Sequence, residues 1–435
     1  MAMEKGTRTE VPPSAHFVHD DEAGELAVDG MGLSTIADEV GTPTHVYSAA
    51  AIAHAYREID EALAPAKHLV CYAMKANGHP EILRLLAGLG AGADVVSGGE
   101  LYWAMQAGIP PERIVFSGVG KSDAEIAYAI EQGIRAIHVE SEPELDVIES
   151  IARARGVTAR IALRVNPDVD PVTHPYIATG IHGTKFGLEL DVARRLLPRI
   201  LESDGLELEG VACHIGSQIG GAEPLADAVA IVAAFAKECA EAGAPIRALD
   251  AGGGWPIHYG DEDAPFAPWR AFGAAIRAGI ERGGAGELDL EVVVEPGRAL
   301  VGDAGALLTR VLYVKDQASK RFVIVDAAMT ELVRPALYGA YHAIVPVRPR
   351  GGELSAADVV GPVCETGDFL ALDRPLPVVE RGDLLLVRNT GAYGASMATR
   401  YNARPLAAEV IVEGDAYRVI RERERVEDLF PQPAE

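Results

Sequence analysis

An apolar segment, His68-Leu-Val-Cys-Tyr-Ala-Met-Lys-Ala-Asn77, carries a single lysine, Lys75, near its carboxyl end. The length of the segment and its β-branched and aromatic residues predict a buried strand. Keeping an ordinary lysine neutral at pH 7 costs about 4.6 kcal/mol, because its pKa lies near 10.4. Lys75 therefore either reaches back to water along its buried stem or forms an imine with an aldehyde, which avoids the charged state.

Similar short apolar runs recur along the chain and alternate with amphipathic segments of helical spacing. The predicted strands are Leu69 to Met74, Ala93 to Ser97, Arg113 to Ser117, Ala136 to Glu140, Arg160 to Val165, Leu208 to His214, Arg247 to Ala251 and Leu290 to Glu295. The helices predicted between them include Pro80 to Leu89, Gly99 to Ala107, Ser122 to Gln132 and Ser141 to Arg155. Eight consecutive βα units predict a closed (β/α)8 barrel. A doubly wound open sheet is the alternative, but no strand is followed by a dinucleotide-binding glycine fingerprint.

The helical alternation fades after about Leu300. Extended runs then appear at Ala306 to Lys315, Arg321 to Asp326, Asp383 to Asn389 and Ala407 to Glu413. We therefore predict a barrel domain at residues 48–300, with a helix from Ala49 to Leu63 leading into it. Residues 1–47 and 301–435 are predicted to form a mostly antiparallel β domain, to which Gly24 to Val28 could add a strand.

The composition limits the partners of the chain. It has 435 residues, 49% of them hydrophobic and 24% charged, with a formal net charge of -25. Such acidity repels phosphate backbones and anionic bilayers, so neither nucleic acid nor membrane is expected as a partner. No apolar leader or long apolar run is apparent, which predicts a cytoplasmic protein. The four cysteines are far apart and predict neither disulfides nor a metal site; they are Cys71, Cys213, Cys239 and Cys364.

Functional groups of such barrels lie at the carboxyl ends of the strands. The first predicted strand ends at Lys75, and the sixth ends at His214 with Ser217 just beyond it. The seventh ends in Gly252-Gly253-Gly254 and the eighth in Glu295-Pro296-Gly297-Arg298. The glycines could point backbone N–H groups at a phosphate, with Ser217 and Arg298 as further donors.

Each of these groups also has an ordinary interpretation. Three glycines often form only a tight turn, His214 could be a core histidine, and Glu295 could pair with Arg298. A phosphorylated pyridine aldehyde would give Glu295 a sharper role, because a carboxylate about 3 Å from the ring nitrogen keeps that nitrogen protonated. His214 would then stack on the ring.

The predicted β domain contributes further candidates. Pro362-Val-Cys-Glu-Thr-Gly-Asp368 places the Cys364 thiol beside Glu365, and Asn389-Thr-Gly-Ala-Tyr-Gly394 places the Tyr393 phenol between glycines. Arg334, in Arg334-Pro-Ala-Leu-Tyr338, could bind a carboxylate through two hydrogen bonds. Buried filler for the cysteine and a surface ion pair for the arginine are the alternatives.

Several strings together closely resemble those of the diaminopimelate decarboxylases, nearly from end to end. They are Tyr72-Ala-Met-Lys-Ala-Asn77, Ala93-Asp-Val-Val-Ser-Gly-Gly-Glu100, Cys213-His-Ile-Gly-Ser-Gln218, Glu295-Pro-Gly-Arg298, Arg334-Pro-Ala-Leu-Tyr-Gly-Ala-Tyr-His342, Cys364-Glu-Thr-Gly-Asp368 and Gly391-Ala-Tyr-Gly394. The resemblance implies the alanine-racemase-like fold of pyridoxal-phosphate enzymes (fold type III): a (β/α)8 barrel, then a β domain, with active sites shared across a homodimer. It also implies decarboxylation of meso-2,6-diaminopimelate to L-lysine and CO2, the last step of lysine biosynthesis.

The resemblance further implies a role for each matching residue. Lys75 would form the imine with pyridoxal 5'-phosphate and Glu295 would hold the pyridine nitrogen. Cofactor contacts would come from His214, Ser217, Gly253, Gly254, Gly297, Arg298 and Tyr393. The substrate would be bound by Arg298, Arg334, Tyr338, Glu365 and Tyr393. Cys364 would protonate the α-carbon, and Cys364 and Glu365 would reach in from the partner subunit.

Two regions need comment beside this resemblance. Trp255-Pro256 follows the three glycines where the family commonly has a small apolar residue and another glycine. The connection from Asn166 to Tyr176 and on to Lys185-Phe-Gly187 resembles the family's active-site loop. Its spaced aspartates lack the remaining ligands of a calcium loop, so no metal is expected.

Three other functions stay open on the sequence. An ornithine or arginine decarboxylase would accept a cationic tail, which an arginine-lined pocket repels. By resemblance, an alanine racemase would have an arginine at the pyridine nitrogen of the cofactor, where this chain has Glu295. A non-catalytic relative that only binds the cofactor or partners is opposed by the presence of both Lys75 and Cys364.

Overall fold

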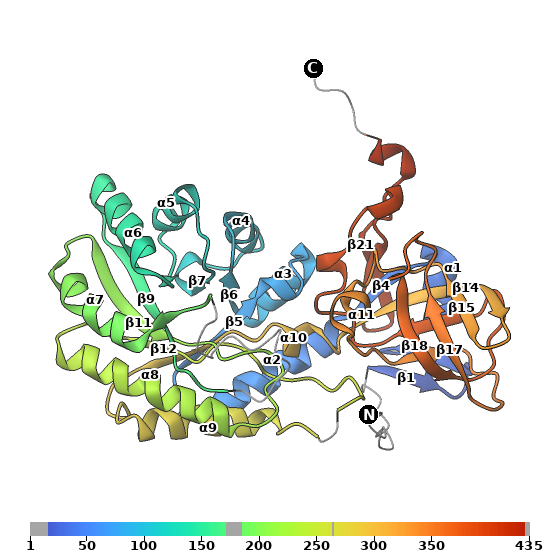
Figure 1. Ribbon diagram of the computed structural model, residues 1–435, viewed down its shortest axis with the longest axis horizontal. Coiled ribbons are helices and arrows are strands. Elements are labelled where there is room, and N and C mark those ends of the chain that lie inside the picture. The colour runs from blue at the N-terminus through green and yellow to red at the C-terminus, as the bar shows by residue number, and fades with distance from the viewer. Residues whose placement is uncertain (1–15, 171–184, 263–264, 431–435) are drawn as a thin grey trace. The chain divides into compact units, whose positions relative to one another are not determined.

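The structure is a computed structural model that describes residues 16–170, 185–262 and 265–430. It divides into two compact units, which we call the barrel unit and the β unit (Figure 1). The barrel unit comprises Ala53–Ile257 and Phe266–Ala299, and the β unit comprises Met1–Ile52, His258–Pro265 and Leu300–Glu435. The short segment His258–Pro265 thus lies between barrel elements in the sequence, yet it belongs to the β unit.

Within the described residues, eight parallel strands form the barrel in the order β5-β6-β7-β8-β9-β11-β12-β13. They are β5 (His68–Ala73), β6 (Gly92–Val95), β7 (Ile114–Phe116), β8 (Ala136–Val139), β9 (Ala159–Asn166), β11 (Leu206–Ala212), β12 (Ala248–Asp250) and β13 (Glu291–Val294). Strand β13 pairs with β5, which closes the ring. The predicted (β/α)8 barrel is therefore confirmed, and the open-sheet alternative is wrong. A short extra strand, β10 (Leu188–Glu189), pairs with β9 outside the ring.

The helices alternate with these strands and lie around the outside of the ring (Figure 1). They are α2 (Ala49–Leu63), α3 (Pro80–Leu89), α4 (Gly98–Gln106), α5 (Asp123–Gln132), α6 (Glu142–Arg155), α7 (Leu190–Glu202), α8 (Glu223–Glu241) and α9 (Trp269–Arg282). Local capping explains several of their starts. The Ser122 hydroxyl accepts a hydrogen bond from the backbone N–H of Glu125 and completes a capping box. Part of the predicted active-site loop, residues 171–184, lies outside the described residues.

The β unit is built on a mostly antiparallel sheet of order β18-β17-β15-β14-β4-β20-β21, with β19 beside β14 and β16 beside β19. Its strands are β4 (Thr44–Ser48), β14 (Gly305–Asp316), β15 (Arg321–Val325), β16 (Ile344–Pro346), β17 (Ser355–Val360), β18 (Phe369–Leu376), β19 (Leu384–Val387), β20 (Ala408–Glu413) and β21 (Ala416–Arg421). The β15–β17 and β4–β20 pairs are parallel. The predicted second fold is thereby confirmed.

The N-terminal residues contribute strands to the β unit. β1 (Phe17–Asp20), β2 (Glu25–Val28) and β3 (Met31–Gly32) form a separate three-stranded sheet. A strand over residues 25–28 is thus present in the β unit, as predicted, but it belongs to this small sheet, and β4 is the N-terminal strand that pairs with β14. The small sheet instead packs through Val28 into a core shared with β14 and β20. Helices α1 (Leu33–Val40) and α11 (Arg334–Tyr338) also belong to this unit.

Two further properties of the described residues concern membrane-spanning helices and cysteines. None of the helices in this part of the chain is both long and apolar enough to cross a bilayer. The four cysteines are free thiols; Cys364 is exposed and the other three are buried.

Helices α8 and α9 pack closely because glycine lines their contact. A Cβ atom added at Gly279 would lie 2.7 Å from the Ala226 carbonyl oxygen and 2.7 Å from Val229 Cβ. In contrast, a Cβ atom at Gly88 of α3 would meet no atom within 4 Å. The α8–α9 contact therefore requires the missing side chain at residue 279 but not at residue 88.

These two glycines give a matched stability test. Gly279→Ala should lower the free energy of unfolding by about 1 to 2 kcal/mol, because overpacking outweighs the gain of about 1 kcal/mol in helix propensity. Gly88→Ala should raise it by up to about 1 kcal/mol. Urea denaturation of both variants measures this difference. Equal stabilisation by both would show that the helices do not depend on their close approach.

Candidate active site

Polar side chains from six barrel strands and the residues after them meet at the carboxyl end of the barrel. They are Lys75, Asp94, Ser117, His138, Asp250 and Glu295. Lys75 was expected to lie at the end of a strand, but it lies beyond the strand. Strand β5 stops at Ala73, and Lys75 sits in a single 3₁₀ turn, Met74–Ala76. The backbone N–H of Ala73 donates to the carbonyl of Pro296, which joins this turn to the segment after β13.

Lys75 makes a direct ion pair with a buried carboxylate. Its Nζ lies 2.8 Å from Asp94 Oδ2. The Asp94 side chain is fully buried, whereas the Lys75 side chain is 38% exposed and so stays accessible to a small molecule. Burial raises the pKa of Asp94, but the Lys75 ammonium and hydrogen bonds from Lys75 and Ser117 outweigh it, so this pKa lies below its ordinary value. Asp94 is therefore an anion, and it holds the Lys75 ammonium in place.

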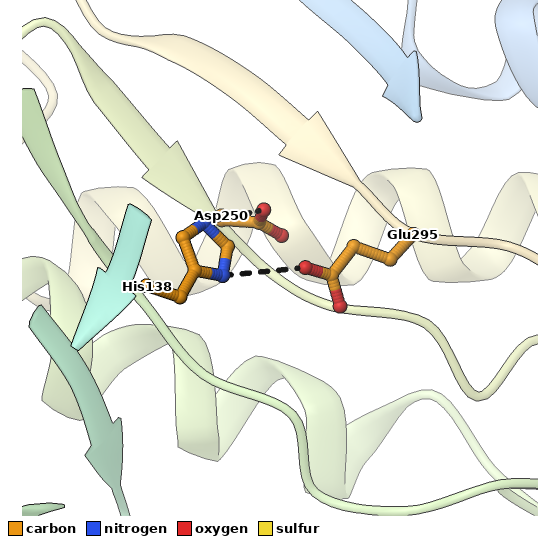
Figure 2. Close-up of side chains that lie close together, drawn as sticks. All are labelled: His138, Asp250 and Glu295. Atoms are coloured by element: carbon orange, nitrogen blue, oxygen red, sulfur yellow. Dashed lines mark ion pairs between the residues drawn. The ribbon is translucent and has the colours of Figure 1, made fainter. Parts of the chain in front are cut away.

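Glu295 lies in a buried cluster with His138 and Asp250. Figure 2 shows the His138 ring beside both carboxylates. His138 Nδ1 lies 3.5 Å from Glu295 Oε1, and Nε2 lies 3.7 Å from Asp250 Oδ2. The Ser117 hydroxyl donates to Glu295 Oε1 at 3.4 Å. The two acid side chains are 4% and 6% exposed, and His138 is 2% exposed. Solvent therefore contributes little to balancing their charge.

Burial decides the protonation of this cluster. It lowers the pKa of His138 to about 3, so the histidine is neutral. Burial also raises the pKa of Asp250 to about 7. Burial, with the nearby charges of Asp250 and Asp94, raises the pKa of Glu295 well above its ordinary value. The cluster thus has more acid groups than cations, and it is suited to a bound positive charge next to Glu295.

His214 follows β11 and has a defined tautomer. The backbone N–H of Gly253 donates to His214 Nδ1 at 2.9 Å, so the ring proton is on Nε2. Burial lowers the pKa of His214 to about 3. His214 therefore presents a flat, neutral ring, and the hydrogen bond from Gly253 fixes its orientation.

The three glycines after β12 are required by close packing. Gly252 and Gly254 have φ values of 72° and 92°, which favour glycine. A Cβ atom at Gly253 would lie 3.2 Å from His214 Cε1, and one at Gly254 would lie 2.5 Å from Ile219 Cδ1. The glycines thus allow the segment after β12 to pack closely, and the Gly253 N–H of this segment lies beside His214.

The unusual Trp255-Pro256 pair is accommodated in the core. Trp255 is 2% exposed and stacks on Phe272 of α9 with ring centroids 5.4 Å apart. The indole N–H of Trp269 donates to the Pro256 carbonyl at 2.9 Å. Through these two contacts, Trp255 and Pro256 attach the segment after the three glycines to α9.

Arg298 and Gly297 lie beside these groups in the barrel unit. Arg298 Nη2 donates to Ser217 Oγ at 3.2 Å. A Cβ atom at Gly297 would lie 3.1 Å from the Cβ atoms of both Ala73 and Ala76, so this glycine allows the segment after β13 to contact the Lys75 turn. The structure thus brings together the predicted barrel residues Lys75, His214, Ser217, Gly253, Gly254, Glu295, Gly297 and Arg298.

The remaining predicted residues lie in the β unit. Arg334 on α11 is 8% exposed, whereas Tyr338 at the end of the same helix is 44% exposed. Cys364 and Glu365 are exposed, and the Cys364 backbone N–H donates to Asn402 Oδ1 at 3.2 Å. Tyr393 is half-buried and has a left-handed φ of 58°.

Several polar groups of the barrel were not identified from the sequence. Asp94, Ser117, His138 and Asp250 lie inside or directly after apolar runs, and only the strand register shows that they face the same interior. Arg164 of β9 was also missed; its Nη1 donates to Glu140 Oε1 at 2.7 Å. A polar residue that interrupts an otherwise apolar strand was the available signal.

The cluster is chemically compatible with a metal ion and also with the cationic ring of an organic cofactor. Ligand atoms of His138, Asp250 and Glu295 all lie within 4.8 Å of one another, close enough to hold a metal ion. Two buried carboxylate oxygens, Asp94 Oδ1 and Asp250 Oδ2, have no hydrogen-bond partner among the described residues. With Lys75 and the glycine turn nearby, the set also fits an aldehyde cofactor with a cationic ring and a phosphate.

Comparison with known proteins identifies the class. Residues 49–302 match the family of pyridoxal-dependent decarboxylases, over its pyridoxal binding domain. Diaminopimelate decarboxylase of Aquifex aeolicus (strain VF5) is 46% identical over 411 residues, covering 94% of this chain and 96% of that protein. Its counterpart from Pseudomonas aeruginosa is 49% identical over 406 residues, covering 93% and 96%.

Solved structures agree with the sequence matches. Helicobacter pylori diaminopimelate decarboxylase complexed with L-lysine has a TM-score of 0.86 and 44% identity, covering 91% of this chain and 98% of that one. The M. jannaschii enzyme in co-complex with L-lysine has a TM-score of 0.90 and 38% identity, covering 95% and 96%. The chain therefore belongs to the diaminopimelate decarboxylases, and the resemblance noted in its sequence is confirmed.

The raised pKa of Asp250 predicts a pH-dependent stability difference. Between about pH 4 and pH 7 the folded protein binds a proton at this site that the unfolded chain releases, so the wild type loses stability as the pH rises. Asp250→Asn removes this loss and keeps the acceptor for the Gly252 N–H. The stability of the variant relative to the wild type should rise by up to about 1.4 kcal/mol per pH unit between pH 5 and 7.

Urea denaturation of the cofactor-free proteins at several pH values gives this difference. A stability difference that does not change with pH would contradict the raised pKa of Asp250.

Proposed function

We propose that the protein decarboxylates meso-2,6-diaminopimelate to L-lysine and CO2, the last step of lysine biosynthesis, with pyridoxal 5'-phosphate as cofactor. One observation carries this proposal: Lys75, held by Asp94, and the buried Glu295 share the mouth of a barrel whose sequence matches pyridoxal-dependent decarboxylases. Relatives similar over nearly the whole chain are named diaminopimelate decarboxylase. Two similar structures were determined with L-lysine.

The barrel residues divide the work of holding the cofactor. When bound, pyridoxal phosphate supplies a cationic ring that accepts the electron pair left by the departing carboxylate. Lys75 would hold the cofactor through its aldehyde, and Glu295, as a carboxylate, would favour a proton on the ring nitrogen. His214 would contact the cofactor with its neutral ring. The phosphate is bound by Ser217, Gly253, Gly254, Gly297 and Arg298.

The β-unit residues complete the site in this proposal, on the strength of their matching motifs. Arg334 and Tyr338, together with Arg298 of the barrel unit, bind a substrate carboxylate, and Glu365 binds the distal ammonium. Tyr393 borders both cofactor and substrate. Cys364 donates a proton to the α-carbon after CO2 leaves. The exposure of Cys364 and Glu365 is compatible with their reaching the active site of a second copy in a homodimer.

The proposal also covers the partners, assembly and cellular location of the protein. The net charge of -25 disfavours nucleic acid and anionic membranes as partners. We propose a cytoplasmic homodimer that acts on a small amino acid.

The alternatives are less well supported. A lysine/ornithine decarboxylase structure with putrescine is 23% identical, so that likeness concerns the fold alone. An alanine racemase would be expected to have arginine at the position of Glu295. A cofactor-binding protein without activity would not need a thiol at residue 364.

Substrate choice tests the proposed reaction directly. The purified enzyme, supplied with cofactor, should release CO2 from meso-diaminopimelate at least tenfold faster than from ornithine or arginine. This follows because an arginine-lined pocket attracts a distal carboxylate and repels a cationic tail, and one buried charge contact is worth about 1.5 to 3 kcal/mol. Faster turnover of ornithine or arginine would reassign the chain to the basic amino-acid decarboxylases.

The electronic role of Glu295 gives a second test. Glu295→Gln keeps the size of the side chain but removes its negative charge, so kcat should fall by about 10² or more. The cofactor should still bind and absorb visible light, because Lys75 is intact. Glu291→Gln, at the opposite end of β13, is the matched control and should keep kcat near the wild-type value. Unchanged turnover in Glu295→Gln would refute the role of this carboxylate.

A further inference from the structure

The Arg334 guanidinium is held by two neighbours in the β unit that no sequence argument identified. Arg334 Nη1 lies 2.8 Å from His342 Nε2 and 3.2 Å from the Tyr259 hydroxyl. The guanidinium carbon also lies 5.0 Å from the centre of the Tyr259 ring, in cation–π range. Tyr259 and His342 contact each other edge to face, with centroids 5.2 Å apart. Together the two contacts fix both the plane and the rotation of the guanidinium.

The hydrogen bonds define the proton position on His342. Its Nδ1 lies 2.9 Å from the carbonyl oxygen of Arg388, which can only accept. The ring proton is therefore on Nδ1, and Nε2 accepts from Arg334. His342 is fully buried and Tyr259 is 6% exposed, so water does not compete strongly for these bonds. In this tautomer both neighbours are neutral, and neither cancels the positive charge of Arg334.

The support extends one step further from the arginine. Tyr259 belongs to the segment His258–Pro265, which packs with the β unit. Asn389 holds this segment: its Nδ2 donates to the His258 carbonyl at 2.6 Å and to Asp303 Oδ1 at 2.7 Å. Arg388 and Asn389 directly follow β19, so one strand end positions both His342 and Tyr259. A rigid element thus determines where the guanidinium lies.

We propose that His342 and Tyr259 are positioning residues that orient Arg334, through uncharged side chains, for the distal carboxylate of the substrate. This inference rests on the proposed function of Arg334 as a carboxylate ligand. Neutral partners suit the task, because a carboxylate in their place would compete with the substrate for the same cation. Neither residue needs to touch the reacting atoms.

A pair of inhibitors isolates this effect in the holoenzyme. L-Lysine keeps the distal carboxylate, whereas 1,5-diaminopentane is the same molecule without it. The ratio of their inhibition constants therefore measures recognition of the carboxylate separately from the chemistry. His342→Phe removes the acceptor but keeps a ring, and should reduce the preference for L-lysine by about tenfold or more. Its KM for meso-diaminopimelate should rise with a smaller change in kcat.

Variants that retain part of the interaction sharpen the test. His342→Gln restores an acceptor near the Nε2 position and should recover most of the preference. Tyr259→Phe keeps the ring under the guanidinium and should lose severalfold. Tyr47→Phe is the matched control, because it also removes a buried hydroxyl bond in the β unit, to Glu409 Oε2. It should lower stability without changing the inhibitor ratio. Visible absorption of the bound cofactor should be normal in every variant.

The outcomes separate this proposal from the one it rests on. If Arg334→Lys leaves the inhibitor ratio unchanged, Arg334 does not bind the carboxylate and the proposed substrate role fails. If Arg334→Lys lowers the ratio but His342→Phe and Tyr259→Phe behave like Tyr47→Phe, only the positioning proposal is overturned. A double variant with Arg334→Lys that loses less than the sum of the single losses supports it.

Discussion

A carboxylate buried at the end of β13 is the constraint on which the site depends. Glu295 has almost no contact with solvent and shares its surroundings with the acids Asp94 and Asp250. Burying an ionised acid is costly unless a cation accompanies it, and the Lys75 ammonium is already paired with Asp94. A cationic ring placed against Glu295 would relieve this imbalance. The energetic cost of the cluster therefore becomes affinity and specificity for a protonated cofactor ring.

The fold supplies this arrangement through close backbone contacts. The barrel places the ends of β5, β6, β12 and β13 around one interior, and glycines at 253 and 297 allow the segments to touch where a side chain would clash. Burial keeps His214 and His138 neutral, so neither histidine adds a positive charge beside the carboxylates. In the β unit, the neutral side chains of His342 and Tyr259 hold the Arg334 guanidinium without adding a negative charge beside it.

Much of this could be predicted from the sequence, for identifiable physical reasons. The apolar runs before Lys75, His214 and Glu295 show where strands end, and barrel topology brings strand ends together. Asp94 and His138 could not be assigned in this way, because their roles depend on strand register and on burial. Tyr259 was missed since no local pattern indicates that residues 258–265 join the β unit. The residue roles in the β unit came from the family resemblance and not from the chain's own periodicity.

The protonation state of the cofactor ring nitrogen tests the central claim most directly. Pyridoxal phosphate labelled with ¹⁵N in the ring can be bound to the enzyme and its nitrogen chemical shift followed by NMR from pH 6 to pH 9. If Glu295 within its acidic surroundings keeps the proton on the ring, the shift should be that of a protonated pyridine throughout this range. A shift typical of an unprotonated pyridine at neutral pH would contradict the account.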